Sequence, residues 1–147
     1  MQHRILIVDD EESILFAMRE YFMSHGYRVD CARGLDDTDT LLSSNPYSAI
    51  IADLRLSGSR GTEGLEIVDR VRARCPATRV IILTAYGLPG TERDARRRGA
   101  DVFLHKPIPL PELARIVLDL LCPPGAVHEE PLRSGAGDEG CTSSGLC

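Results

Sequence analysis

Three short apolar runs, each leading to a polar side chain, constrain the fold of this chain most. Residues 5–8 (ILIV) precede Asp9, residues 49–52 (AIIA) precede Asp53, and residues 80–83 (VIIL) precede Thr84. A short run that is apolar at every position is typical of a strand covered on both faces. The runs therefore predict three buried strands, each with a side chain capable of chemistry at its end.

Weaker strand patterns and helical patterns occupy the rest of the chain. We predict strands at 4–9, 28–31, 49–52, 80–83 and 101–104, and helices at 11–25, 35–44, 64–74, 92–98 and 111–121. Strands that alternate with helices predict an α/β fold, with a parallel sheet, helices on both faces and right-handed crossovers. Ligands of such sheets bind beyond the carboxyl ends of the strands.

Length and composition predict one domain. The chain has 147 residues, enough for one ordinary domain. We expect residues 1–122 to fold and residues 123–147, rich in Gly, Pro, Ser and acids, to form a flexible tail. No apolar run approaches the roughly 20 residues that span a bilayer, and no leader pattern precedes the first strand. We therefore expect a cytoplasmic protein without membrane contacts.

Charge and cysteine pattern argue against two kinds of site. The formal net charge of −5 counts against direct nucleic-acid binding, which usually needs a basic face. The five cysteines include no C-x-x-C pair, so the usual zinc and redox signatures are missing. A disulfide or metal role for Cys141 and Cys147 stays open. We interpret the arginines between 93 and 98 as a solvated helix face, with a docking patch for an acidic partner as the alternative.

The predicted sheet gathers a set of reactive side chains at one edge. They follow the ends of four strands: Asp9, Asp10, Asp53, Thr84 and Lys106. Three carboxylates that lie close together repel one another unless a cation joins them. Oxygen ligands with room for water and phosphate oxygens suit Mg²⁺. A phosphoryl group that arrives at a carboxylate needs its oxygens neutralised, which this metal, the lysine and the threonine hydroxyl could provide.

This constellation resembles the receiver domain of two-component response regulators. The matching segments are Val8-Asp9-Asp10-Glu11, Asp53-Leu54, Leu83-Thr84-Ala85 and Lys106-Pro107, and the resemblance covers residues 4–121. It implies a CheY-like, flavodoxin-like doubly wound fold with strand order 2-1-3-4-5. It also implies a phosphoprotein of signal transduction, with Mg²⁺ as cofactor and a sensor histidine kinase or a histidine phosphotransfer protein as partner.

The resemblance implies a phosphoacceptor and its metal ligands. Asp53 matches the carboxylate that attacks a phosphohistidine of the kinase, and it is also one of the ligands of the bound metal. Asp10 matches a direct metal ligand, and Asp9 matches a ligand that acts mainly through water. The backbone carbonyl of Arg55 matches the remaining protein ligand.

The resemblance also implies a switch. Thr84 matches the hydroxyl that turns towards the phosphoryl oxygens, and Lys106 matches the lysine that pairs with the acceptor. Phe103 matches an aromatic side chain that swings inward after Thr84 moves, with plain core packing as the alternative reading. The bond between Lys106 and Pro107 is expected to be cis. The surface of helix 92–98, strand 101–104 and helix 111–121 would then change.

We expect a downstream protein to read that surface, or phosphate to pass onward in a phosphorelay. The expected protein is a single-domain response regulator without an attached output domain; a homodimer through the same surface stays open. It would catalyse only its own phosphorylation and dephosphorylation, and is not expected to be an enzyme in the usual sense. Arg55 and Tyr86 occupy positions that tune loss of phosphate in this family, and a bulky Tyr86 favours slow loss. The loop 54–63 is longer than is usual there.

Two rival hypotheses remain. One is a phosphatase or phosphotransferase that uses Asp53 as nucleophile, as in haloacid-dehalogenase-like hydrolases; those enzymes have an aspartate two residues further on, where this chain has Arg55. The other is a receiver-like interaction module that is never phosphorylated. Loss of an acidic or lysine position is its usual sign, and no such position is lost here.

Overall fold

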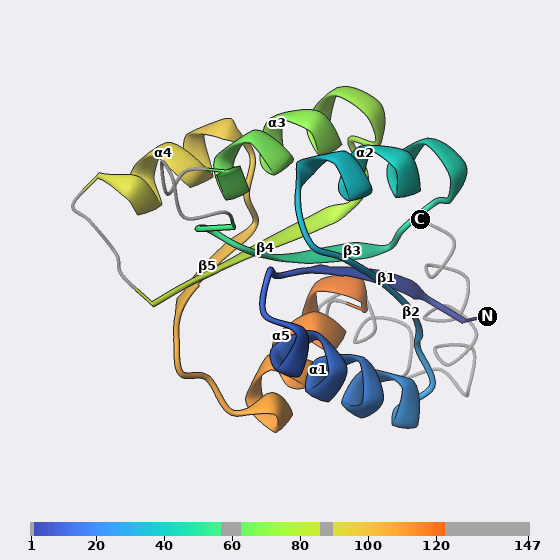
Figure 1. The fold of residues 1–147 in the computed structure, drawn as a ribbon. Helices are drawn as coiled ribbons and strands as arrows, with labels where there is room; N and C mark the ends of the chain where they lie inside the picture. Colours follow the sequence, from blue (N-terminus) through green and yellow to red (C-terminus); the bar gives the residue numbers. More distant parts are fainter. Residues whose placement is uncertain (1, 57–62, 86–89, 123–147) are drawn as a thin grey trace, which may run out of the picture.

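Five parallel strands form one sheet between two layers of helices in the computed structural model, which describes residues 2–56, 63–85 and 90–122 (Figure 1). The strands are β1 (Arg4–Val8), β2 (Arg28–Ala32), β3 (Ala49–Asp53), β4 (Arg79–Thr84) and β5 (Val102–His105). Their order in the sheet is β2-β1-β3-β4-β5, and every neighbouring pair is parallel. The predicted α/β fold and strand order are confirmed.

The helices lie on both faces of the sheet. They are α1 (Glu12–Ser24), α2 (Leu35–Ser44), α3 (Glu63–Arg74), α4 (Thr91–Arg98) and α5 (Leu110–Leu121). Helices α1 and α5 cover one face, and α2, α3 and α4 cover the other (Figure 1). Within the described residues, no helix has the length and apolar character needed to cross a membrane.

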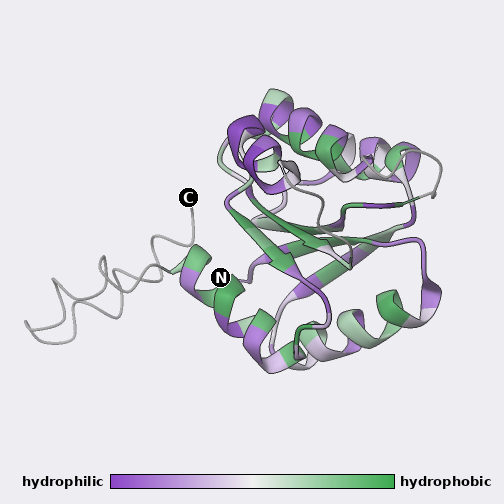
Figure 2. Cartoon of the chain, turned by 90° about the vertical axis from the view of Figure 1, so that its left-hand side faces the viewer, coloured by the Kyte–Doolittle hydropathy of each residue, from purple (hydrophilic) through white to green (hydrophobic). Residues whose placement is uncertain are grey.

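Alternation along the strands divides the core between the two faces. On β1, Ile5 and Ile7 pack under α1 and α5, whereas Leu6 and Val8 pack under the other three helices. All four side chains are at most 1% exposed. Figure 2 shows that the strands are largely hydrophobic, whereas the helices around them carry both hydrophilic and hydrophobic residues. Burial on both faces is the reason that these runs contain no polar residue.

The register of the sheet aligns the carboxyl ends of the central strands. Val8 pairs with Ala52, Asp53 pairs with Leu83, and Thr84 pairs with His105. The residues that follow these pairs therefore share one edge of the sheet. The predicted tail at 123–147, most of the enlarged loop and Tyr86 lie outside the described residues.

Candidate functional site

The three predicted acidic ligands meet at the carboxyl edge of the sheet. Asp9, Asp10 and Asp53 each place a carboxylate oxygen within 4.8 Å of the others. Asp9 and Asp10 follow β1, and Asp53 is the last residue of β3. Asp9 is buried, Asp53 is partly buried and Asp10 is exposed, so the cluster runs from the protein interior to solvent.

Lys106 joins two of these carboxylates from the other side of the site. Its Nζ lies 3.2 Å from Asp9 Oδ2 and 3.4 Å from Asp53 Oδ2. Its backbone N–H donates to the Thr84 carbonyl at 2.8 Å, which ties the loop after β5 to the end of β4. The Lys106–Pro107 peptide bond is cis, as expected.

A turn after β1 holds Asp9 in place. The other oxygen of this carboxylate, Oδ1, accepts a hydrogen bond from the Glu11 backbone N–H at 2.9 Å. The Asp9 side chain is 5% exposed and is therefore shielded from water. A buried carboxylate with both oxygens engaged has little freedom to turn away from its neighbours.

Within the described residues, Lys106 is the ammonium group that contacts the acidic cluster. Burial, together with the nearby Asp9 carboxylate, raises the pKa of Asp53, although Lys106 and a backbone hydrogen bond from Arg55 oppose the rise. Burial alone would lower the pKa of Lys106, but the carboxylates of Asp53 and Asp9 outweigh it and the pKa is raised. Three carboxylates thus lie close together, the Lys106 ammonium group contacts two of them, and the site favours additional positive charge.

The donor set fits a hard divalent cation. Carboxylate oxygens on one open edge, with Asp10 exposed to solvent, suit Mg²⁺, which usually keeps several waters and binds few protein ligands. The cluster contains no sulfur or imidazole ligand that would favour zinc. The residues present therefore fit the predicted metal.

Gly64 packs against the backbone beside Asp53, a contact that the sequence pattern did not indicate. A Cβ atom at this position would lie 2.7 Å from Leu54 Cα and 2.8 Å from the Asp53 carbonyl oxygen. The Gly64 N–H donates to the Leu54 carbonyl at 2.9 Å. The first turn of α3 thus presses directly on the backbone beside Asp53. A glycine shortly after a strand end was the available signal, but only the packing gives it meaning.

Thr84 and Phe103, the predicted switch residues, are both in the interior. Thr84 is fully buried at the end of β4. Phe103 is 6% exposed and belongs to the core cluster beneath α2, α3 and α4. The aromatic ring is therefore already packed inward in this structure. Arg55 is exposed and adjoins Asp53 through the backbone hydrogen bond.

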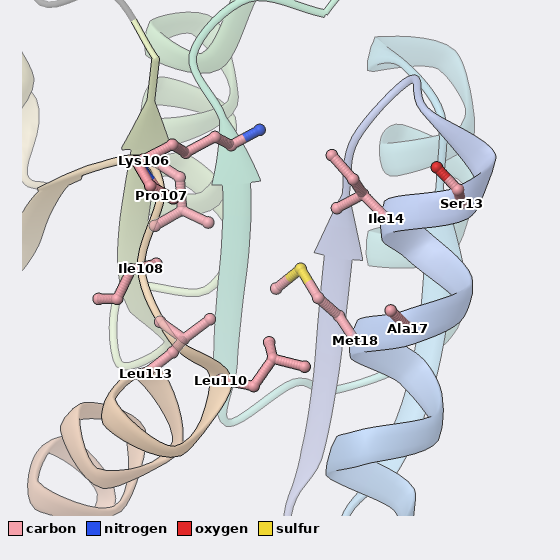
Figure 3. Close-up of a pocket in the computed structure, with 10 residues that line it drawn as sticks. Ser13, Ile14, Ala17, Met18, Lys106, Pro107, Ile108, Leu110 and Leu113 are labelled. Carbon is pink, nitrogen blue, oxygen red and sulfur yellow. The ribbon is translucent and has the colours of Figure 1, made fainter.

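An apolar groove of about 340 Å³ lies beside the acidic cluster. It runs between α1 and the loop that joins β5 to α5, with Ile14 and Met18 on one side and Ile108 and Leu110 on the other (Figure 3). Lys106 stands at the end of the groove nearest the strand tips (Figure 3). The sequence pattern did not reveal this groove, because its walls come from elements far apart along the chain.

Comparisons with known proteins agree on one family. The family model described as the response regulator receiver domain matches residues 5–118. The alginate biosynthesis transcriptional regulatory protein AlgB of Pseudomonas syringae pv. tomato is 37% identical over 106 residues, which cover 72% of this chain and 23% of AlgB. The transcriptional regulatory protein TctD of Salmonella typhimurium is 32% identical over 127 residues, 86% of this chain and 55% of TctD. The chain thus spans between about a quarter and about half of these relatives.

Solved structures support the same fold. A CheY-like response regulator receiver domain protein from Methanospirillum hungatei JF-1 superposes with a TM-score of 0.76 at 24% sequence identity. The superposition covers 81% of this chain and 93% of that structure.

Proposed function

Because the chain belongs to the response regulator receiver family of two-component signalling, we propose that Asp53 accepts a phosphoryl group from a histidine kinase in a Mg²⁺-dependent step. The observation that carries this proposal is the cluster of Asp9, Asp10 and Asp53 with Lys106 Nζ at 3.2 and 3.4 Å from two of the carboxylates. Receiver domains act as switches rather than as enzymes with a separate product, and self-catalysed dephosphorylation belongs to the same proposal.

Each side chain has a distinct task in the proposed transfer. An Asp53 oxygen forms a bond to phosphorus while the bond between phosphorus and the imidazole nitrogen of the donor breaks, and the imidazole leaves. Asp9, Asp10 and Asp53, with the Arg55 carbonyl, would hold the metal. When bound, Mg²⁺ neutralises charge on the phosphoryl oxygens. Lys106 stays protonated at neutral pH, because its pKa is raised, and pairs with the phosphoryl group.

Thr84 and Phe103 form the proposed switch. The Thr84 hydroxyl donates to a phosphoryl oxygen, and the phosphoryl group adds about −1.5 to −2 charges at neutral pH. Phe103 is already buried in the unphosphorylated protein, at 6% exposed. We therefore propose that the inward packing of this ring is populated before phosphorylation, and that phosphorylation increases its population. The surface of α4, β5 and α5 then changes, and a downstream partner reads it.

The apolar groove is the proposed docking place of the phosphodonor protein. It is lined by Ile14, Met18, Ile108 and Leu110, and it adjoins Lys106. A helix of the donor that buries apolar side chains there would bring its phosphohistidine to Asp53. A few residues that are fully buried near the centre of an interface usually carry most of its binding energy, so this groove is a suitable place for such contacts.

Regulation of transcription is the response that we propose for the pathway, since the relatives AlgB and TctD are named as transcriptional regulatory proteins. Both are longer than the region that this chain matches. Direct contact of this chain with nucleic acid is not part of the proposal, and the absence of such contact remains a prediction from its net charge of −5.

Phosphorylation by a small donor tests the proposal directly. The purified chain is incubated with acetyl phosphate, with and without Mg²⁺, and its intact mass is measured alongside that of Asp53→Asn. We expect one phosphoryl group on the native chain with Mg²⁺, and none on the variant or without metal. If the native chain gains no phosphoryl group, the chain is an interaction module that is not phosphorylated.

A further inference from the structure

Helix α4 buries fewer residues than any of the other four helices. Its eight residues include one buried side chain, Ala95. By contrast, α3 buries five residues and α5 buries three. A helix with so little apolar burial gains little stability from the core. Polar contacts must therefore contribute much of what keeps α4 in place.

These polar contacts come from the C-terminal half of the helix. Arg98 Nη1 lies 2.8 Å from Asp69 of α3, and Arg96 Nη1 lies 3.5 Å from the Asp101 carbonyl oxygen. In the N-terminal half, the side chains of Glu92 and Asp94 pair with arginines of α4 itself. Within the part of the chain that the structure describes, α4 is thus anchored at one end.

Arg72 of α3 forms the centre of that anchor. Its guanidinium donates to the Gly99 carbonyl at 2.7 and 3.0 Å, and to the Asp101 carboxylate at 2.9 Å. It also donates to the carbonyls of Pro76 at 2.9 Å and Thr78 at 2.6 Å. One side chain therefore joins the end of α3 and the start of β4 to the residue that follows α4.

The backbone at Gly99 is fitted to this contact. Gly99 has a φ of +120°, which L side chains rarely adopt. A Cβ there would lie 2.7 Å from Arg72 Nε. Asp101, the other acceptor, also accepts from the Val80 N–H at 2.8 Å and so fixes the guanidinium against β4. The turn between α4 and β5 is therefore shaped around Arg72.

We propose that Arg72 is the positioning residue of α4: it fixes the C-terminal end of the helix, and the N-terminal half moves about that anchor. The chain enters α4 through Gly90 after leaving β4 at Thr84. A displacement of Thr84 thus acts first on the N-terminal end of α4, opposite the Arg72 anchor, and the helix reorients rather than shifts as a whole. The proposal deepens the proposed function, because α4 belongs to the surface that a partner would read, but the anchor exists without phosphate.

Amide hydrogen exchange in the unphosphorylated, metal-free full chain tests the anchor. In Arg72→Gln, the amides of Ala95 to Ala100 should exchange about 10- to 100-fold faster, the factor that corresponds to losing hydrogen bonds to a charged group. Core amides of β3 should change much less. Arg72→Lys, which keeps the charge but cannot reach all the acceptors at once, should lie in between.

Arg70→Gln is the matched control. Arg70 lies on the same helix and is similarly exposed, at 34% against 24% for Arg72, but it pairs with Asp39 of α2. It should leave exchange in α4 within about twofold of the native value, because its ion pairs in the described part of the chain go to α2 and to α3 itself and not to α4. An equal effect of both variants, or equal acceleration of core amides, would overturn the proposal.

Backbone order along α4 tests separately whether its N-terminal half moves about the Arg72 anchor. In the native chain, backbone N–H order parameters should fall from Arg98 towards Thr91. Uniform order along α4 would contradict the pivot. If Arg72→Gln does not fold, the amide exchange rates of Arg72→Lys are measured instead. If the α4 amides of this variant exchange no faster than those of the native chain, the anchor is refuted. None of these measurements uses a phosphodonor, so their failure is distinct from failure of Asp53 phosphorylation.

Discussion

Asp53 lies where burial opposes its negative charge. The carboxylate is 13% exposed and stands near Asp9, so that its pKa is raised even with Lys106 at 3.4 Å. A raised pKa means that ionisation of Asp53 opposes folding in the absence of a bound cation. The penalty is fully present above the folded-state pKa and disappears as the pH falls through it.

We therefore expect Asp53→Asn to be more stable than the native chain in metal-free buffer at pH 7. The increase in Tm should be on the order of 3 °C, the shift that about 1 kcal/mol gives in a domain of this size. The difference should shrink as the pH is lowered, because the native carboxyl group becomes protonated. Thermal unfolding from pH 7 to pH 4 measures both. Asp119→Asn on the exposed side of α5 is the control; equal stabilisation by it would contradict the explanation.

Gly64 makes a second prediction at the scale of a residue. Gly64→Ala should lower stability by about 1–3 kcal/mol, the usual effect of overpacking, because its Cβ would meet the backbone of Asp53 and Leu54 at 2.7–2.8 Å. It should also slow phosphorylation by acetyl phosphate. Gly34→Ala is the control, since its Cβ would meet nothing within 4 Å. If both variants are phosphorylated at the native rate, Gly64 has no positioning role.

At the scale of elements, α1 serves two surfaces. Its buried residues are Leu15, Met18 and Phe22. Ile14 and Ala17 line the groove beside the site, whereas Phe16 is 64% exposed and lies outside the groove. The same helix thus carries an apolar groove wall and an exposed apolar residue that can be compared directly.

Ile14→Ser should slow phosphoryl transfer from a phosphohistidine protein about tenfold or more, which corresponds to about 1.4 kcal/mol of lost docking energy. Transfer from acetyl phosphate should be unchanged, because a small donor needs no docking surface. Rates of both reactions under single-turnover conditions make the measurement. Phe16→Ser is the control and should affect neither. An equal loss with both donors would indicate damage to the site itself.

At the scale of the whole molecule, folding and metal binding are linked through the acidic cluster. Asp9 and Asp10 follow β1 and Asp53 ends β3, so the cluster exists only when the sheet has formed. A cation that binds the folded chain and not the unfolded chain stabilises the fold.

Mg²⁺ at 100 times its Kd should raise the free energy of unfolding by about 2.7 kcal/mol. Asp10→Asn should abolish most of this increase, while leaving metal-free stability nearly unchanged because Asp10 is exposed. Glu11→Gln, at the neighbouring exposed position, should retain the increase. Chemical denaturation of each chain with and without Mg²⁺ measures this increase in the free energy of unfolding. Stabilisation that persists in Asp10→Asn would place the metal elsewhere.

The fold could be predicted from the sequence because both faces of the sheet are buried. Residues 5–8, 49–52 and 80–83 cannot carry polar side chains in such a sheet, so the strands are visible as apolar runs. The element bounds differ from the prediction by at most one residue at each end, where capping and not periodicity decides. The cis bond at Lys106–Pro107 came from the family resemblance and is confirmed.

The sequence by itself determined which side chains reach the site, since in a parallel sheet the residues after each strand share one edge. Only the tertiary structure decided how they meet: the contact of Lys106 with both Asp9 and Asp53, and the inward packing of Phe103. It alone also showed the roles of Gly64 and Arg72, and the groove beside α1. The physical reason is that strand patterns are local, whereas a close approach or a hydrogen bond between helices depends on residues distant in the chain.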